Sequence, residues 1–161
     1  MIPPDIVSLI HGPQVMFVAT RSQALRPHCR RVAGAIADAG ADTVTLFLPD
    51  QVNRQTLEHA QRNGRVAFLL IDAFSHRSYQ LKGAYLSSRP STEADKAVRD
   101  LYMEKIAAHM RNWFVPVPDE FWNAVILDPS TSLSFRVETI FDQTPGPNAG
   151  KPVPFTPSAA G

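Results

Sequence analysis

The chain has 161 residues and a formal net charge of +1 at pH 7, which suits one domain with a single core. The charge gives no general reason to expect a nucleic acid or an anionic membrane as partner. The longest wholly apolar run, residues 66–71, is far too short to span a membrane, and a single cysteine excludes an internal disulfide. With no signal-peptide pattern at the N-terminus, we expect a soluble, cytoplasmic protein.

The first part of the chain predicts one short helix followed by three strands. Prolines 3 and 4 open the helix, a Gly-Pro pair at 12–13 stops it, and its apolar positions share one face: Ile6, Leu9 and Ile10. An almost wholly apolar run predicts a buried strand over residues 15–20. A second strand is expected from residue 27 to about 36, and a hairpin at 39–42 leads into a third strand over 43–48.

A short surface helix is predicted directly after the third strand. Asn53 is a good N-cap, Val52 can pack against Leu57, and the Asn63-Gly64 pair is a good stop. Free backbone N–H groups and the helix dipole favour an anion at such a helix start, and Arg54 lies there. We therefore expect a phosphate at this corner of the molecule.

The second half of the chain predicts three more strands and the longest helix. Strands are expected over residues 65–71 and 78–86, and the alternation of Leu133, Phe135, Val137, Thr139 and Phe141 with polar residues predicts a half-buried strand. Thr92 and Asp95 are spaced as a capping box at the start of the long helix. Its apolar positions recur at helical spacing: Val98, Leu101, Tyr102, Ile106, Met110 and Trp113. Residues 119–125 are expected to add one or two helical turns.

Six short strands and a few helices predict a mainly β, α+β fold: a small, mostly antiparallel barrel with helices packed at its sides. The tail from Thr144 on is rich in proline and glycine and has few apolar groups, so it cannot form a core of its own. We expect one domain over residues 1–143 and a C-terminal arm over 144–161.

Polar side chains on two of the strands suggest a ligand. Because strand side chains alternate in direction, His28 and Arg30 share one face of the second strand, while Cys29 and Arg31 share the other. The fifth strand carries a polar set on the face opposite its apolar residues; this set is Ser78, Gln80 and Lys82. Together with Arg54, such donors suit a ligand with a phosphate, hydroxyls and ring carbonyls. The alternative is a solvated outer face.

An ordered series of segments resembles the FMN-binding split barrels related to pyridoxamine 5'-phosphate oxidase. The segments are Phe17-Val18-Ala19-Thr20, Arg26-Pro27-His28, Thr45-Leu46-Phe47-Leu48, Asn53-Arg54, Asn63-Gly64-Arg65-Val66 and Arg77-Ser78-Tyr79-Gln80-Leu81-Lys82-Gly83. The resemblance covers about residues 13–88 and the strand near 134–141. It implies a homodimer of six-stranded antiparallel split β-barrels with flanking helices, with an FMN at each of two interface sites.

The resemblance also implies which residues hold the cofactor. Arg30 or Arg31 matches a basic position in the second strand, and Asn53, Arg54 and Gln55 stand where the family has Ser, Arg and Lys. The full expected FMN-binding set is Arg30, Arg31, Leu48, Arg54, Gln55, Ser78, Gln80 and Lys82. A flavin carries hydride or electrons itself, so the function expected is an FMN-dependent oxidoreductase acting on a small substrate, with no assigned catalytic side chain.

The chain departs from the family at two basic positions. Gln55 replaces a lysine, and Ala35 or Ile36 falls where another lysine is expected. Each missing charge-assisted bond is worth about 1.5–3 kcal/mol, so flavin affinity is expected to be reduced. Arg136 lies in the strand that carries a substrate arginine in the family but lacks the surrounding pattern, so we do not predict vitamin B6 oxidation.

Several other assignments stay open at this point. The second hypothesis is a non-catalytic dimer that binds flavin weakly or binds haem. Haem stays open because His28 and His76 could approach each other in the fold. A deazaflavin could also replace FMN. The five histidines show no metal-ligand spacing, so no metal site is expected. Cys29 is expected to be a small core residue rather than a reactive thiol. Trp113, Phe114 and Trp122 favour core or dimer contacts over a substrate pocket.

Overall fold

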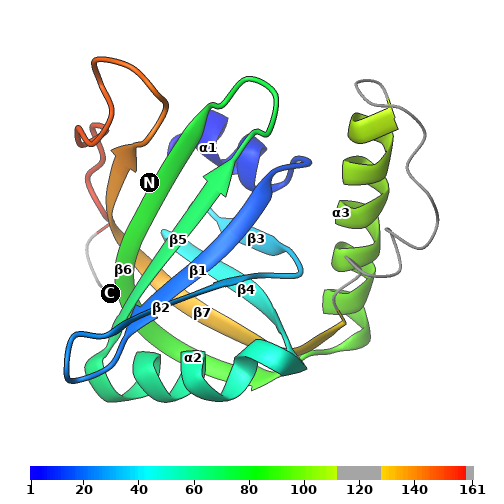
Figure 1. Ribbon diagram of the computed structural model, residues 1–161, viewed down its shortest axis with the longest axis vertical. Helices are drawn as coiled ribbons and strands as arrows, with labels where there is room; N and C mark the ends of the chain where they lie inside the picture. Colours follow the sequence, from blue (N-terminus) through cyan, green and yellow to red (C-terminus); the bar gives the residue numbers. More distant parts are fainter. Residues whose placement is uncertain (112–127, 159–161) are drawn as a thin grey trace.

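The computed structural model describes residues 1–111 and 128–158. Its elements in chain order are α1 (Pro4–Ile10), β1 (Val15–Arg21), β2 (Pro27–Arg31), β3 (Ala35–Asp38), β4 (Thr43–Pro49), α2 (Asp50–Asn63), β5 (Arg65–Ile71), β6 (Ser78–Pro90), α3 (Glu93–Arg111) and β7 (Pro129–Asp142). The strands form one antiparallel sheet in the order β2-β1-β5-β6-β7-β4-β3. The expected mainly β split barrel with flanking helices is confirmed (Figure 1).

The core of the barrel comes from strict alternation along its strands. Inward side chains of β1 and β5 are fully buried while their neighbours are half-buried or exposed. The largest fully buried side chains include Phe47, Phe68 and Phe135, and Ile6 and Ile10 of α1 join the same core. In Figure 1, α2 lies across one end of the barrel and α1 lies towards the other. Apolar burial on the inner face therefore leaves the outer face of the sheet for other contacts.

The second strand is broken in two, which gives seven strands rather than the six expected. Backbone bonds show the reason: the Val32 N–H donates to Met16 at 3.1 Å, and the Ala33 N–H donates to Phe47 at 2.8 Å. Residues 32–34 thus carry the chain from one edge of the sheet, at β2, to the other, at β3. Gly34 has φ +145, and a Cβ there would lie 3.4 Å from the Phe47 ring. A side chain at this crossing would be strained.

Helix α2 begins earlier than the sequence indicated, so its start lies before Asn53 and Arg54. Its N-cap is Pro49, with an extended backbone and no side-chain cap, so Asn53 is not the cap. Pro49 lacks the N–H that would continue the β4 ladder, and the helix starts at Asp50 directly after it. Arg54 is therefore the fifth helical residue rather than a residue of the helix start. The end was predicted correctly: Gly64 is left-handed and its N–H donates to Ala60 at 2.8 Å.

Strand β7 changes the direction of its alternation part of the way along. Its register against β6 passes from Val137 opposite Gly83 to Thr139 opposite Lys82, so Glu138 is an extra, bulged residue. Leu133, Phe135 and Val137 are buried as expected, but beyond the bulge Ile140 is the buried residue. The prediction that Thr139 and Phe141 continue the inward face was therefore wrong, because the bulge turns both to the outer side.

Helix α3 packs beside the barrel through fewer residues than its apolar spacing indicated. Tyr102 and Ile106 are buried, and the Tyr102 hydroxyl donates to the Gln14 carbonyl at 2.7 Å. Leu101 is 51% exposed, which contradicts its assignment to the packed face. The expected positions at Trp113, Phe114, Trp122 and the helical turns over 119–125 lie outside the described residues.

The C-terminal arm folds back along the barrel. The Val153 N–H donates to Ile140 at 2.9 Å, and Phe141 forms an isolated antiparallel bridge with Pro152. Val153 and Phe155 pack against the core, and the Thr156 carbonyl accepts a hydrogen bond from the Met1 ammonium at 3.0 Å. The arm thus adds to the barrel without a core of its own, and its Thr156 lies beside Met1.

Candidate functional site

The outer face of five neighbouring strands presents two parallel rows of side chains. Residues directly opposite each other in an antiparallel pair project to the same side, so the register fixes each row. The first row contains Arg31, Phe17, Leu69, Gln80 and Phe141, and we name it the flavin row because Arg31 and Gln80 belong to the set expected to bind FMN. The second row contains Cys29, Ala19, Ala67, Lys82 and Thr139. Three of the expected site residues therefore lie in these two rows: Arg31, Gln80 and Lys82.

A hollow of about 490 Å³ opens on this face at the second row. Its floor includes Ala19 and Ala67, whose small side chains leave space between the larger residues of the flavin row. We name this hollow the alanine pocket; its lining is Ala19, Thr20, Arg21, Pro27, Arg65, Val66, Ala67, Lys82, Gly83, Glu138 and Thr139. Its volume lies within the range of small-molecule sites, about 300–1,000 Å³.

The two arginines of β2 face different ways. Arg30 pairs with the inward-facing Val18 but is exposed at the sheet edge, where its guanidinium donates to the Cys29 carbonyl at 2.9 Å. Arg31 lies on the flavin row and is half-buried, and its Nε is buried with no hydrogen-bond partner in the described part of the chain. The Arg31 guanidinium lies beside the Tyr102 hydroxyl. Burial raises the pKa of Tyr102, although the positive charge of Arg31 acts to lower it.

The remaining candidates for cofactor binding lie on and before α2. Arg54 and Gln55 are both exposed on the second turn of the helix. The Leu48 side chain is fully buried in the core, and its carbonyl accepts a hydrogen bond from Ser130 at 3.4 Å. Only the Leu48 backbone could therefore reach a ligand. The structure brings Arg54 and Gln55 together but sets them on a different element from Gln80 and Lys82.

The three β6 candidates lie in successive outward positions with different surroundings. Ser78 is buried under the start of the C-terminal arm: its N–H donates to the Thr144 hydroxyl at 3.1 Å, and its own hydroxyl donates to the His76 carbonyl at 2.7 Å. Gln80 is half-buried at the centre of the flavin row. Lys82 is exposed, with its ammonium 4.6 Å from the centre of the Phe141 ring. Gln80 and Lys82 are thus the accessible donors of this strand.

The expected core position of Cys29 was wrong, because Cys29 is exposed on the edge strand β2. The β2 register places Cys29 opposite Ala19 on the outer side of the sheet, away from the core. The sequence showed the alternation but could not show that β2 is an edge.

A buried histidine pair was missed by the sequence reasoning. His28 and His59 are 8% and 9% exposed, and their ring centres lie 5.8 Å apart in an edge-to-face arrangement. His59 Nδ1 lies 3.4 Å from the Thr20 hydroxyl, while His28 Nε2 is buried with no hydrogen-bond partner in the described part of the chain. The idea that His28 approaches His76 was wrong: His28 pairs with Thr20 at one end of β1, and His76 follows β5 at the opposite end.

The buried His28 predicts a loss of stability in mild acid. Burial lowers the His28 pKa, and the nearby Arg30 and His59 lower it further. In the unfolded chain a histidine has a pKa near 6.5, so protonation below about that pH favours unfolding. We expect the free energy of unfolding to fall between about pH 7 and pH 5, and the fall to be smaller in His28→Gln. Urea titrations at several pH values measure this slope.

The control for this prediction is His76→Asn. His76 is exposed in a turn with φ 58, a conformation that asparagine tolerates. If the free energy of unfolding falls with pH as steeply in His28→Gln as in His76→Asn, His28 does not cause the loss of stability.

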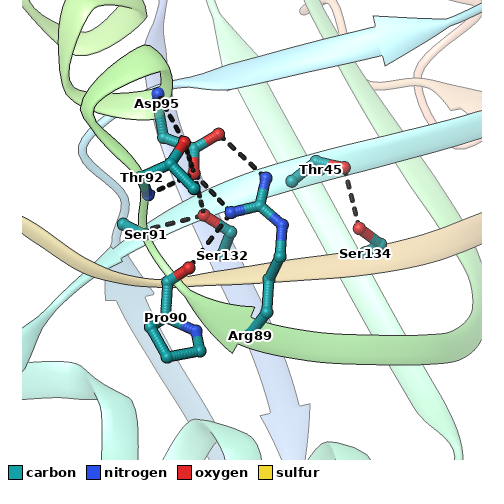
Figure 2. Close-up of polar contacts among 8 residues, drawn as sticks. All are labelled: Thr45, Arg89, Pro90, Ser91, Thr92, Asp95, Ser132 and Ser134. Atoms are coloured by element: carbon teal, nitrogen blue, oxygen red, sulfur yellow. Dashed lines mark hydrogen bonds and ion pairs between the residues drawn. The ribbon is translucent and has the colours of Figure 1, made fainter.

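A second polar cluster joins α3 to the sheet (Figure 2). The expected capping box is confirmed: the Thr92 N–H donates to Asp95 at 2.7 Å, and the Asp95 N–H donates to the Thr92 hydroxyl at 3.3 Å. Arg89 of β6 holds both oxygens of the Asp95 carboxylate, at 2.5 and 3.0 Å, and Ser132 of β7 donates to it at 3.1 Å. The hydrogen bonds from Arg89 are the main reason why the pKa of Asp95 lies well below its usual range. This fully partnered cluster is structural, not a ligand site.

No helix of residues 1–111 and 128–158 is long and apolar enough to cross a membrane. Within the same residues, no three histidine, cysteine, aspartate or glutamate side chains are placed to hold a metal ion.

Comparisons with known proteins show which family and which solved structures the chain is similar to. A family model described as pyridoxamine 5'-phosphate oxidase matches residues 2–143. No curated protein matches the chain. Solved structures with a similar fold include HupZ of Group A Streptococcus, with 19% identity, a TM-score of 0.57 and coverage of 93% of this chain and 100% of that one. An F420 reductase has 15% identity, a TM-score of 0.58 and coverage of 86% and 98%. An FMN-binding protein from Syntrophomonas wolfei has 10% identity, a TM-score of 0.55 and coverage of 84% and 82%.

Proposed function

Because the chain belongs to the pyridoxamine 5'-phosphate oxidase family, we propose that it binds FMN and acts as an oxidoreductase on a small substrate. The observation that carries the proposal is the flavin row, where Arg31 and Gln80 flank the apolar side chains of Phe17 and Leu69. A flat ring with polar edges fits such a surface: apolar side chains contact the ring, and donors at each end meet its carbonyls or phosphate. FMN, when bound, supplies hydride or electron transfer.

The donor set fits the anionic part of FMN. The orphaned Nε of Arg31 is a buried donor in need of an acceptor, and a phosphate oxygen would satisfy it. Arg54 is an exposed cation that can add a second charge-assisted bond. This chain's own part is to bind and orient the cofactor: Arg31 and Arg54 hold the phosphate, and Gln80 and Lys82 fix the ring edge.

We extend the proposal to a homodimer whose interface is the outer face of the sheet. Half-buried apolar side chains gather there on adjacent strands: Val15, Phe17, Leu69, Ile71 and Phe141. An apolar sheet face of this kind is more stable when a partner covers it. A second copy across this face would also exclude water from the ring. The small-molecule substrate would reach the flavin at the edge of this interface.

The second candidate function is a non-catalytic barrel that binds flavin weakly. The apolar residue at position 36 favours this function. Ala35 is buried, so the outward position at which the family resemblance implies a lysine is Ile36, which is 37% exposed. The chain thus places an apolar side chain where a cation would hold a phosphate. Gln55 likewise contributes no charge.

The proposal predicts that Arg54→Ala weakens FMN binding by about 10- to 100-fold, because one charge-assisted bond worth about 1.5–3 kcal/mol is removed. Quenching of FMN fluorescence on titration with the purified protein measures the affinity. The matched control is Arg62→Ala on the same helix, where Arg62 pairs only with Glu58 at 3.1 Å within the described residues. Equal FMN affinity in the two variants would contradict the assigned phosphate position.

A further inference from the structure

The alanine pocket has a cause that can be traced to particular residues. Ala19 and Ala67 lie opposite each other in the β1–β5 pair, while the next outward pair along the same strands is Phe17 and Leu69. The floor therefore drops where two methyl groups replace two large side chains. At the far side, the lining is completed by Lys82 and Gly83 of β6 and by Glu138 and Thr139 at the bulge of β7. The result is a sheet-face hollow with an apolar floor, beside the flavin row rather than within it.

Cations surround this apolar floor. Arg65 forms an ion pair with Glu138 at the rim, so its charge is compensated. Lys82 and Arg21 also line the pocket, and neither has an acidic partner in the part of the chain that the structure describes. The Phe141 ring fixes the Lys82 ammonium from one side, at 4.6 Å from the ring centre. Two uncompensated positive charges thus face a surface that favours flat apolar groups.

We propose that the alanine pocket binds a small anion with a flat aromatic body, such as an aromatic carboxylate or sulfonate. The aromatic body lies on Ala19 and Ala67, and the acidic group accepts hydrogen bonds from Lys82 and Arg21. This inference goes beyond flavin binding and does not require it. Lys82 is common to both, because it lines the pocket while its ammonium lies over the Phe141 ring of the flavin row. If a flavin occupies the flavin row, the pocket places an anionic substrate next to it.

The test uses two fluorescent probes of similar shape with the full-length protein. The anionic probe is 8-anilinonaphthalene-1-sulfonate, and the neutral probe is N-phenyl-1-naphthylamine. Ala67→Leu fills the floor and should weaken binding of both probes at least about tenfold. Lys82→Met keeps the side-chain length and removes the charge, so it should weaken the anionic probe by about tenfold and spare the neutral one. Lys96→Met, an exposed lysine paired with Glu93 at 2.7 Å, is the matched control and should change neither.

The outcomes separate the alternatives. Unchanged binding of the anionic probe in Ala67→Leu overturns the proposal, as does an equal effect of Lys82→Met and Lys96→Met. A change of oligomeric state in Ala67→Leu without loss of probe also overturns it, because a second copy would then be the occupant. Ala19→Leu on the opposite strand replaces Ala67→Leu if circular dichroism shows that the latter is unfolded.

Titration with FMN distinguishes this proposal from the flavin proposal. Arg54→Ala should lose FMN and keep the anionic probe, and Ala67→Leu should lose the probe and keep FMN. Parallel loss of FMN and probe in Ala67→Leu would overturn the separate pocket, since the flavin itself would then occupy it. Absence of FMN binding in every variant, with intact probe binding, would sink the flavin proposal and leave the pocket standing.

Discussion

Gly83→Ala is expected to destabilise the protein by about 3 kcal/mol or more, and the variant is expected to be recovered largely unfolded. A Cβ at this position would lie 1.7 Å from the Arg136 carbonyl oxygen, 2.7 Å from its carbon and 3.1 Å from the Val137 Cα. These are backbone atoms of the central β6–β7 pair, and no side-chain rotation relieves the overlap. Urea unfolding followed by circular dichroism measures the effect.

Gly40→Ala is the control for this prediction. Among the described residues, a Cβ on Gly40 would meet only the Asp38 carboxylate, at an ordinary 3.4 Å, so the effect is expected to stay within about 0.5 kcal/mol. A Gly83→Ala protein with wild-type stability would show that β6 and β7 do not approach as closely as described at the Glu138 bulge. The wall of the alanine pocket would then need a different explanation.

Asp95→Ala is the substitution with the next largest expected effect, a loss of about 2–3 kcal/mol. The Asp95 carboxylate is buried and accepts hydrogen bonds from Arg89, Thr92 and Ser132 (Figure 2). Removing it leaves the guanidinium without its bidentate partner and removes the half of the capping box in which the carboxylate accepts the Thr92 N–H. Because Arg89 is half exposed, water solvates the guanidinium in the variant, and the loss is smaller than for a fully buried ion pair. Glu93→Gln, an exposed residue in the same first turn, is the control and should be close to neutral.

The Asp95 carboxylate also makes the stability of the fold depend on pH in acid. The pKa of Asp95 is lowered in the fold relative to about 3.9 in the unfolded chain, so its contribution is complete above pH 4 and is lost as the pH falls further. The wild-type protein should therefore lose stability more steeply than Asp95→Ala below about pH 4. Parallel pH profiles of the two proteins below pH 4 would contradict this account of the cluster.

The elements with purely local signals could be predicted from the sequence. Strand β5 has the bounds that its apolar run indicated, and the Thr92–Asp95 capping box forms as its spacing predicted. The Gly64 stop of α2 is a local property as well, because glycine adopts the left-handed conformation at little cost. The ordered segments also led to the correct family and to a split barrel.

The differences arise where a distant strand decides the local structure. Nothing near Gly34 reveals that the chain leaves the β1 edge there and pairs with β4. The bulge at Glu138 depends on the backbone of Gly83, 55 residues earlier by their numbers, which β7 approaches closely. The early start of α2 is different: Asn53 offered a plausible cap, but the proline that ends β4 allowed the helix to begin before it.

The candidate site was predicted only as a list of residue types. Alternation placed Gln80 and Lys82 on one face correctly, but it gave no neighbours from other strands. The alanine pocket exists because β1 and β5 pair in the register that sets Ala19 beside Ala67. Both are small residues with no signal of their own. His28 and His59 likewise meet only through the packing of α2 on the barrel.

The central claim is that this chain holds a phosphorylated flavin, and a paired titration of the purified full-length protein with FMN and riboflavin tests it most directly. The two ligands share the ring and differ in the phosphate. We expect saturable quenching of FMN fluorescence with one flavin per chain and at least about tenfold weaker binding of riboflavin, because Arg31 and Arg54 have no phosphate to bind in the latter. No saturable binding of FMN, or equal affinity for the two ligands, would contradict the account.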